Sequence, residues 1–217
     1  MILTIIYLAI LLSSLIVAIV CRNSIKKRRL SIFIPYLAYV FIQEFGLNII
    51  FDFVCPGCAT HIFYNFYRPV SVILLSTFFY AIPFNLKQRK VIIWAVAIYL
   101  SVTVFTFTFI YSLLEPSPYL SGLGGLLLTC FSLITIFNYF NLDNIFQEKH
   151  WIPVVWICIG ITIFYPVLNI SSTFHDKLLL LNANIFGDKI YRVVPKIMSL
   201  FMYSCFIYAF YLCKKND

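Results

Sequence analysis

The sequence predicts an all-α membrane protein, a polytopic bundle of seven transmembrane helices with its N-terminus out and its C-terminus in. Three observations carry this prediction. Of the 217 residues, 62% are hydrophobic and 11% are charged, with a mean hydropathy of +0.95. The hydrophobic residues form seven long blocks, and the basic residues gather between alternate blocks. Since a soluble domain carries about 25% charged residues, an ordinary soluble enzyme, a disordered regulator and a coiled coil are excluded.

Seven spans account for most of the chain. A spanning helix needs about 20 apolar residues at a rise of about 1.5 Å each, so seven of them use about 140 residues. The remainder of the 217 residues suffices for loops and ends but not for a second, soluble domain. We therefore expect residues 1–217 to form a single transmembrane domain, with any effector supplied by a partner protein.

The first three blocks are separated by charge and by a short turn. The first block, Ile2–Cys21, is followed by five basic residues between Arg22 and Arg29. It is too long for the apolar region of a signal peptide and no basic residue precedes it, so we expect a span that is retained. The second block, Leu30–Val54, ends at a Cys-Pro-Gly-Cys loop, and the third, Ile62–Phe84, is followed by three basic residues.

The last four blocks are bounded in the same way. The fourth, Val91–Leu114, is closed by a Glu-Pro-Ser-Pro turn, and the fifth runs Leu120–Phe140. The sixth runs Trp151–Ile170, and a longer loop separates it from the seventh, Ile190–Cys213, which two lysines follow. Each block is long enough to cross the hydrocarbon core, so each is predicted to be a transmembrane helix.

The basic residues set the orientation. Of the 16 Lys and Arg residues, 11 fall in the first, third and fifth loops and the C-terminal tail. Cytoplasmic loops carry an excess of Lys and Arg, which places the N-terminus outside and the C-terminus inside. We expect a multi-pass protein of a cell membrane, the inner membrane in a bacterium. The net charge of +8 is explained by this pattern, so no nucleic-acid partner is expected.

The second block carries a polar stripe. Glu44, Asn48 and Asp52 follow at intervals of four residues, which places them on one side of a helix. Glu44 lies roughly 15 Å below the outer end of its helix, where an unpaired carboxylate costs several kcal/mol. We therefore expect Glu44 to face the bundle interior and to have a partner.

The third block offers that partner. Asn65 and Arg68 share one helix face, so we predict an ion pair between Glu44 and Arg68, with the asparagines satisfying the remaining groups. This arrangement is either the floor of an outward-facing polar pocket or a structural pair that fixes helix register. The pocket would be completed by Lys196, Arg192 and either Tyr165 or Asn169. The candidate ligand-binding residues are Glu44, Asn48, Asp52, Asn65, Arg68 and Lys196.

Cys55 and Cys58 form the second candidate site, in an outer loop with His61 three residues further on. An oxidising compartment favours a disulfide between them. A membrane thiol oxidase also places such a pair in an outer loop, so a redox role stays open. No metal site is expected, because the two cysteines and the histidine lack a fourth ligand.

Several segments resemble small uncharacterised bacterial seven-helix membrane proteins. They are Phe33-Ile34-Pro35-Tyr36, Glu44, Tyr64-Asn65 and the aromatic run from Trp151 to Tyr165. The resemblance implies the seven-helix architecture, and that group has no established activity to carry over.

The leading functional hypothesis is a non-enzymatic sensor or receptor-like module, without a cofactor, that binds an unknown small ligand and signals through a partner protein. A transporter of small solutes with a 3+1+3 helix arrangement is the first alternative. It draws on the recurrence of an Ile-Pro step at Ile34-Pro35 and Ile152-Pro153, although the spacing to later matching residues differs. A thiol-redox membrane protein that uses Cys55 and Cys58 is the second alternative.

Overall fold

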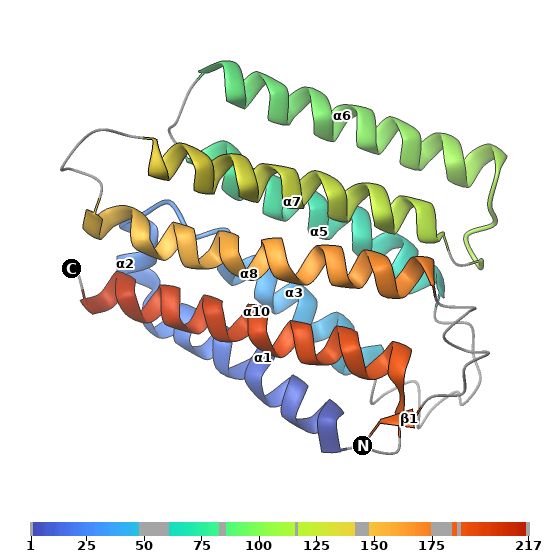
Figure 1. The fold of residues 1–217 in the computed structure, drawn as a ribbon, viewed down its shortest axis with the longest axis horizontal. Coiled ribbons are helices and arrows are strands. Elements are labelled where there is room, and N and C mark those ends of the chain that lie inside the picture. Colours follow the sequence, from blue (N-terminus) through green and yellow to red (C-terminus); the bar gives the residue numbers. More distant parts are fainter. Residues whose placement is uncertain are drawn as a thin grey trace.

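The computed structural model shows a bundle of long helices with one short β-ladder (Figure 1). It describes residues 2–47, 61–82, 86–115, 117–141, 148–174, 184–185 and 188–215. The helices are α1 (Ile2–Val20), α2 (Arg22–Lys27), α3 (Phe33–Phe45), α5 (His61–Ala81), α6 (Leu86–Phe109), α7 (Pro118–Phe140), α8 (Glu148–Thr173) and α10 (Ile190–Lys215). The strands β1 (Asn184–Ile185) and β2 (Asp188–Lys189) pair antiparallel before α10.

Six of the helices in the described part of the chain are long and apolar enough to cross a membrane: α1, α5, α6, α7, α8 and α10. These are the lengths and compositions of a multi-pass membrane protein. The predicted second span coincides with α3, which is 13 residues long. The description of this segment stops at Leu47, and the rest of the predicted span lies outside the described residues. The count of seven spans and the orientation therefore stay predictions.

The basic segment after the first span is helical, whereas the sequence pattern indicated a loop. Arg22–Lys27 forms α2, because Lys and Arg are good helix formers even where the apolar pattern stops. The helix ends in a Schellman motif, in which the Leu30 N–H bonds to the Ile25 carbonyl and the Arg29 N–H to the Lys26 carbonyl. Arg29 has the left-handed φ of 59° that this motif needs. The buried Ile25 and Leu30 anchor the turn that leads into α3.

Helices α8 and α10 pack along each other near the middle of the bundle, with α7 beside α8 and α1 beside α10 (Figure 1). Helix α6 lies at the edge, against α5 and α7, and exposes most of its apolar side chains. Both α1 and α10 begin at the same end of the bundle, where α3 and α8 finish (Figure 1). We call this the N-terminal end and the opposite one the C-terminal end.

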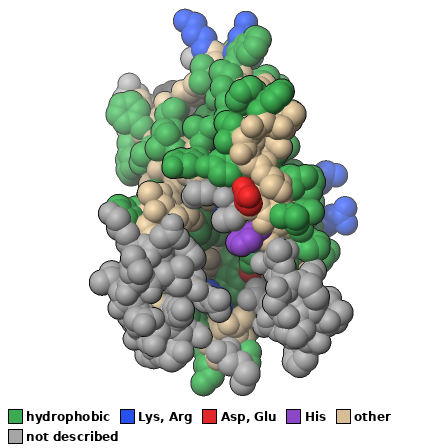
Figure 2. Space-filling model, turned by 90° about the vertical axis from the view of Figure 1, so that its right-hand side faces the viewer, with side chains coloured by type: hydrophobic (Ala, Val, Ile, Leu, Met, Phe, Trp, Pro, Cys, Tyr) green, Lys and Arg blue, Asp and Glu red, His purple; other side chains and the backbone are tan. Residues whose placement is uncertain are grey.

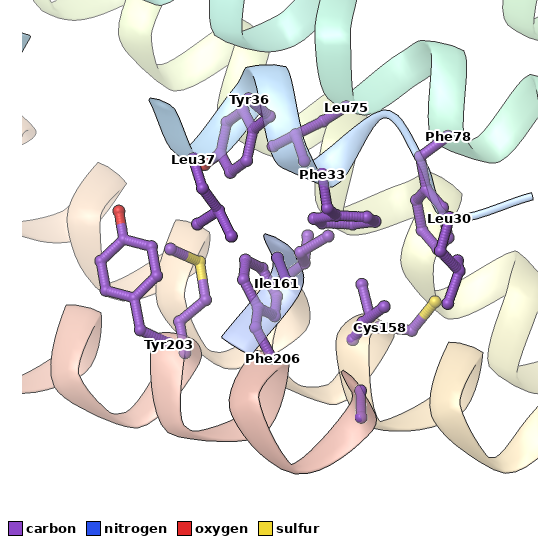
Figure 3. Close-up of a cluster of buried hydrophobic side chains, with 14 of the residues drawn as sticks. Leu30, Phe33, Tyr36, Leu37, Leu75, Phe78, Cys158, Ile161, Tyr203 and Phe206 are labelled. Atoms are coloured by element: carbon purple, nitrogen blue, oxygen red, sulfur yellow. The ribbon is translucent and has the colours of Figure 1, made fainter. Parts of the chain in front are cut away.

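Four fully buried phenylalanines close the half of the bundle nearest the C-terminal end. Phe33 of α3 lies edge-on to Phe78 of α5 at 5.0 Å between ring centroids, and to Phe206 and Phe210 of α10 at 5.2 and 5.9 Å. Leu75, Cys158 and Ile161 fill the space around them (Figure 3). We call Phe33, Phe78, Phe206 and Phe210 the phenylalanine cluster.

Candidate functional site

Glu44 lies in the last turn of α3, near the N-terminal end, and is partly buried. Its carboxylate interacts electrostatically with tyrosines on four different helices. With a fifth tyrosine that joins them, they form what we call the tyrosine cluster: Tyr7 of α1, Tyr36 of α3, Tyr67 of α5, Tyr165 of α8 and Tyr203 of α10. The prediction that Glu44 faces the bundle interior agrees with this arrangement.

Hydrogen bonds join two pairs of tyrosines within the cluster. Tyr36 bonds to Tyr165, which links α3 to α8, and Tyr7 bonds to Tyr203, which links α1 to α10. The rings of Tyr7 and Tyr203 lie 6.2 Å apart between centroids. A buried phenol can donate one hydrogen bond and accept others, and a carboxylate accepts several. The cluster is therefore chemically suited to binding a small polar molecule through hydrogen bonds.

Lys196 of α10 lies about two helical turns closer to the N-terminal end than Tyr203, by the rise of about 1.5 Å per residue. Its Nζ donates a hydrogen bond of 2.7 Å to the Thr4 Oγ1 of α1. The lysine thus sits at the same end of the bundle as Glu44, as the sequence predicted. This hydrogen bond also links α10 to α1.

Asn65 and Arg68 share a face of α5, as predicted, but they bind the connection between α6 and α7. The Asn65 Nδ2 donates to the Leu113 and Glu115 carbonyls, each at 2.9 Å, and its Oδ1 accepts from the Ser117 Oγ at 3.1 Å. The Arg68 Nη1 donates to the Ser117 carbonyl at 3.3 Å. Asn65 is 3% exposed, so its amide is used to hold this connection in place.

The sequence predicted an ion pair between Arg68 and Glu44, whereas in the structure the Arg68 guanidinium donates a hydrogen bond to the Ser117 carbonyl. Tyr67, one residue before Arg68, interacts electrostatically with both charged groups. Tyr67 of α5 therefore interacts with both charges, while the Arg68 guanidinium also holds the α6–α7 connection through Ser117.

Figure 2 looks onto the N-terminal end of the bundle and shows an acidic side chain and a histidine close together, with hydrophobic side chains covering the flanks. The exposed His61, at the first residue of α5, and the exposed Glu115 both belong to this end. Four predicted site residues, Asn48, Asp52, Cys55 and Cys58, lie outside the described residues.

Among the described residues, Cys21, Cys130, Cys158 and Cys205 are free cysteines. Within the described ranges, no group of three or more His, Cys, Asp or Glu side chains is placed to hold a metal ion.

Four members of the tyrosine cluster were not predicted as site residues, because tyrosine is abundant in the interfacial belts of membrane proteins. Their depth within the predicted helices is the feature that could have identified them from the sequence. Measured from the N-terminal end of the bundle, Tyr36 lies nine residues from the end of α3 at Phe45, and Tyr203 lies 13 residues from the start of α10 at Ile190. A hydroxyl at that depth needs a hydrogen-bond partner inside the bundle.

Comparison of the chain with protein-family models, curated proteins and solved structures finds no match.

Proposed function

We propose that this chain is a membrane sensor or receptor-like module that binds a small polar ligand at its N-terminal end and signals through a partner protein. The observation that supports the proposal is the set of tyrosines from four helices that interact with Glu44, joined by Tyr165 from a fifth helix. A ligand that exchanges hydrogen bonds with this cluster would act on α1, α3, α5, α8 and α10 together. Ionisable groups inside a membrane protein are functional candidates by default.

The chemistry of the cluster favours a ligand with hydrogen-bond donors. Glu44 accepts hydrogen bonds, and the phenols of Tyr7, Tyr67 and Tyr203 can donate or accept. An amine or a solute with several hydroxyls matches such a site, because each donor finds an acceptor in a place where water is scarce.

The proposed location is a cell membrane, the inner membrane in a bacterium, with the ligand site facing outwards. Ten basic residues of the described chain support this orientation, because all of them belong to the C-terminal end. They are Arg22, Lys26, Lys27, Arg28, Arg29, Lys87, Arg89, Lys90, Lys214 and Lys215. An excess of Lys and Arg is typical of the cytoplasmic side.

The phenylalanine cluster favours a sensor over a transporter. Phe33, Phe78, Phe206 and Phe210 are each 0% exposed and fill the bundle interior between the tyrosine cluster and the C-terminal end. A transported solute needs a path past these rings, whereas a sensor needs only a site at one end. The transporter alternative therefore requires a second conformation in which these rings separate.

A binding screen tests the proposal. The purified protein in detergent is heated with a panel of amines, amino acids and sugars, and a ligand is expected to raise the melting temperature through mass action. Glu44→Gln is expected to abolish this rise. The matched control is Glu115→Gln, which makes the same change at an exposed position of the same end and is expected to leave the rise intact.

The same solutes are then tested for uptake into proteoliposomes. A sensor is expected to bind without uptake. Uptake that Glu44→Gln abolishes and Glu115→Gln leaves unchanged would replace the sensor with the transporter, and a rise in melting temperature that survives Glu44→Gln would refute the site.

A further inference from the structure

A pocket of about 570 Å3 lies at the C-terminal end of the bundle, far along the helices from the tyrosine cluster. Three cations from separate segments line it: Lys26 from the last turn of α2, Arg29 from the connection to α3, and Arg89 from the first turn of α6. No acidic side chain is among its lining residues in the described ranges. Three like charges around one cavity repel one another unless an anion lies between them.

Arg29 has a left-handed backbone conformation that arginine does not favour. It is the residue with positive φ in the Schellman motif at the end of α2, where glycine is the usual residue. Its Nη1 lies 3.5 Å from the Ala81 carbonyl, at the end of α5. The hydrogen bond to Ala81, which also lines the pocket, holds the Arg29 guanidinium beside the cavity.

Arg89 is positioned by an aromatic ring. Its guanidinium lies over Tyr80 at 5.5 Å from the ring centroid, and Tyr80 also lines the pocket. The planar guanidinium group matches the geometry of a phosphate and can bind it through two parallel hydrogen bonds. Arg29 and Arg89 together therefore present two phosphate-binding groups to one cavity, with the Lys26 ammonium as a third positive charge.

Apolar side chains line the pocket beside the cations and the hydroxyls of Ser31 and Thr77. Ile32 and Pro35 of the α3 start line it. On α6, the next turn on the Arg89 side of the helix exposes Ile93, at 53%. Because α5 and α6 are long enough to span the membrane, the pocket at their joined ends lies at the depth of the lipid headgroups. Cations at the headgroup level beside exposed apolar side chains match an amphipathic, anionic molecule.

We propose that this pocket binds the phosphate headgroup of an anionic membrane phospholipid through Lys26, Arg29 and Arg89, with the acyl chains lying along α6. The basic residues would then have a second role besides setting topology. The inference is independent of the proposed ligand site at the other end of the bundle.

The test compares two double variants with the same change in charge. Arg29→Gln with Arg89→Gln removes both pocket guanidinium groups. Arg22→Gln with Lys90→Gln removes two exposed cations of the same end that do not line the pocket. Binding of phosphatidylglycerol and of phosphatidylcholine to the full chain in detergent is measured by native mass spectrometry.

Wild type is expected to retain phosphatidylglycerol in preference to phosphatidylcholine. The pocket variant is expected to bind phosphatidylglycerol at least about tenfold more weakly, because two charge-assisted hydrogen-bond donors are lost, and the control pair to stay within about threefold. Equal losses in both double variants, or equal retention of the two lipids by wild type, would overturn the proposal.

Inorganic phosphate distinguishes the lipid from a free anion. If phosphate alone raises the melting temperature of wild type and not of the pocket variant, the pocket takes free phosphate and the lipid assignment fails. Arg29→Gly guards against misfolding, because glycine suits the left-handed φ of 59° while removing the guanidinium. It is expected to keep the helical circular dichroism of wild type and to weaken phosphatidylglycerol binding, and unchanged binding would overturn the role of Arg29.

Discussion

Replacing Asn65 by alanine removes three of the hydrogen bonds through which α5 holds the connection between α6 and α7. They run to the carbonyls of Leu113 and Glu115 at 2.9 Å each and from the Ser117 Oγ at 3.1 Å. At 3% exposure, water cannot readily replace the lost partners. Each bond is worth about 0.6–1.5 kcal/mol, so Asn65→Ala is expected to lower the free energy of unfolding by about 2–4.5 kcal/mol.

The matched control is Asn138→Ala on α7. Asn138 is partly buried, and its Nδ2 has no hydrogen-bond partner among the described residues, so the same truncation is expected to cost less than about 1 kcal/mol. Both free energies are measured by titrating the protein in mild detergent with a denaturing detergent and following the loss of helical circular dichroism. Equal losses in the two variants, or a loss below about 0.5 kcal/mol for Asn65→Ala, would refute the role of these hydrogen bonds.

Two further predictions concern packing and orientation. A Cβ on Gly160 of α8 would meet the Cβ of Cys205 at 3.2 Å and the backbone of Met202 at 3.3 Å, so Gly160→Ala is expected to cost about 1–2 kcal/mol of unfolding free energy. In the same titration Gly122→Ala, with nothing within 4 Å, is expected to be neutral or to stabilise by up to about 1 kcal/mol, and equal losses would contradict the close contact between α8 and α10. A reporter joined to the C-terminus tests its side of the membrane: a cytoplasmic fluorescent protein is expected to fluoresce and an alkaline phosphatase fusion to be inactive, whereas the reverse would contradict the inside C-terminus.

The positions of the long helices could be predicted because apolar length alone sets them. The fifth predicted span, Leu120–Phe140, differs from α7 by two residues at its start, and the seventh, Ile190–Cys213, by two at its end. The predicted helix boundaries were less accurate where a helix includes charged residues. Helix α6 begins at Leu86 and includes basic residues that had marked a loop, because long basic side chains can reach the headgroups from within a helix.

The sequence could predict only those features of the candidate site that depend on a single helix. The spacing of Asn65 and Arg68 fixes their common face of α5, and that part agrees with the structure. Which neighbour that face meets depends on the order of helices in space, which periodicity does not contain. Arg68 therefore lies on Ser117, and the groups around Glu44 are tyrosines of helices remote in the sequence, such as Tyr203.

In the proposed sensor, α3 and α10 are the helices that can carry a signal through the bundle. Each contributes to both clusters: the ring of Tyr36 lies 6.1 Å from Phe33, and that of Tyr203 lies 5.9 Å from Phe206 (Figure 3). Phe33 and Phe206 in turn meet edge-on at 5.2 Å. A ligand that draws Tyr36 and Tyr203 together or apart must therefore change how α3 packs on α10 at the phenylalanine cluster, because a close-packed interior cannot absorb the shift locally. A partner protein that contacts the C-terminal end would then detect the ligand without any passage through the rings.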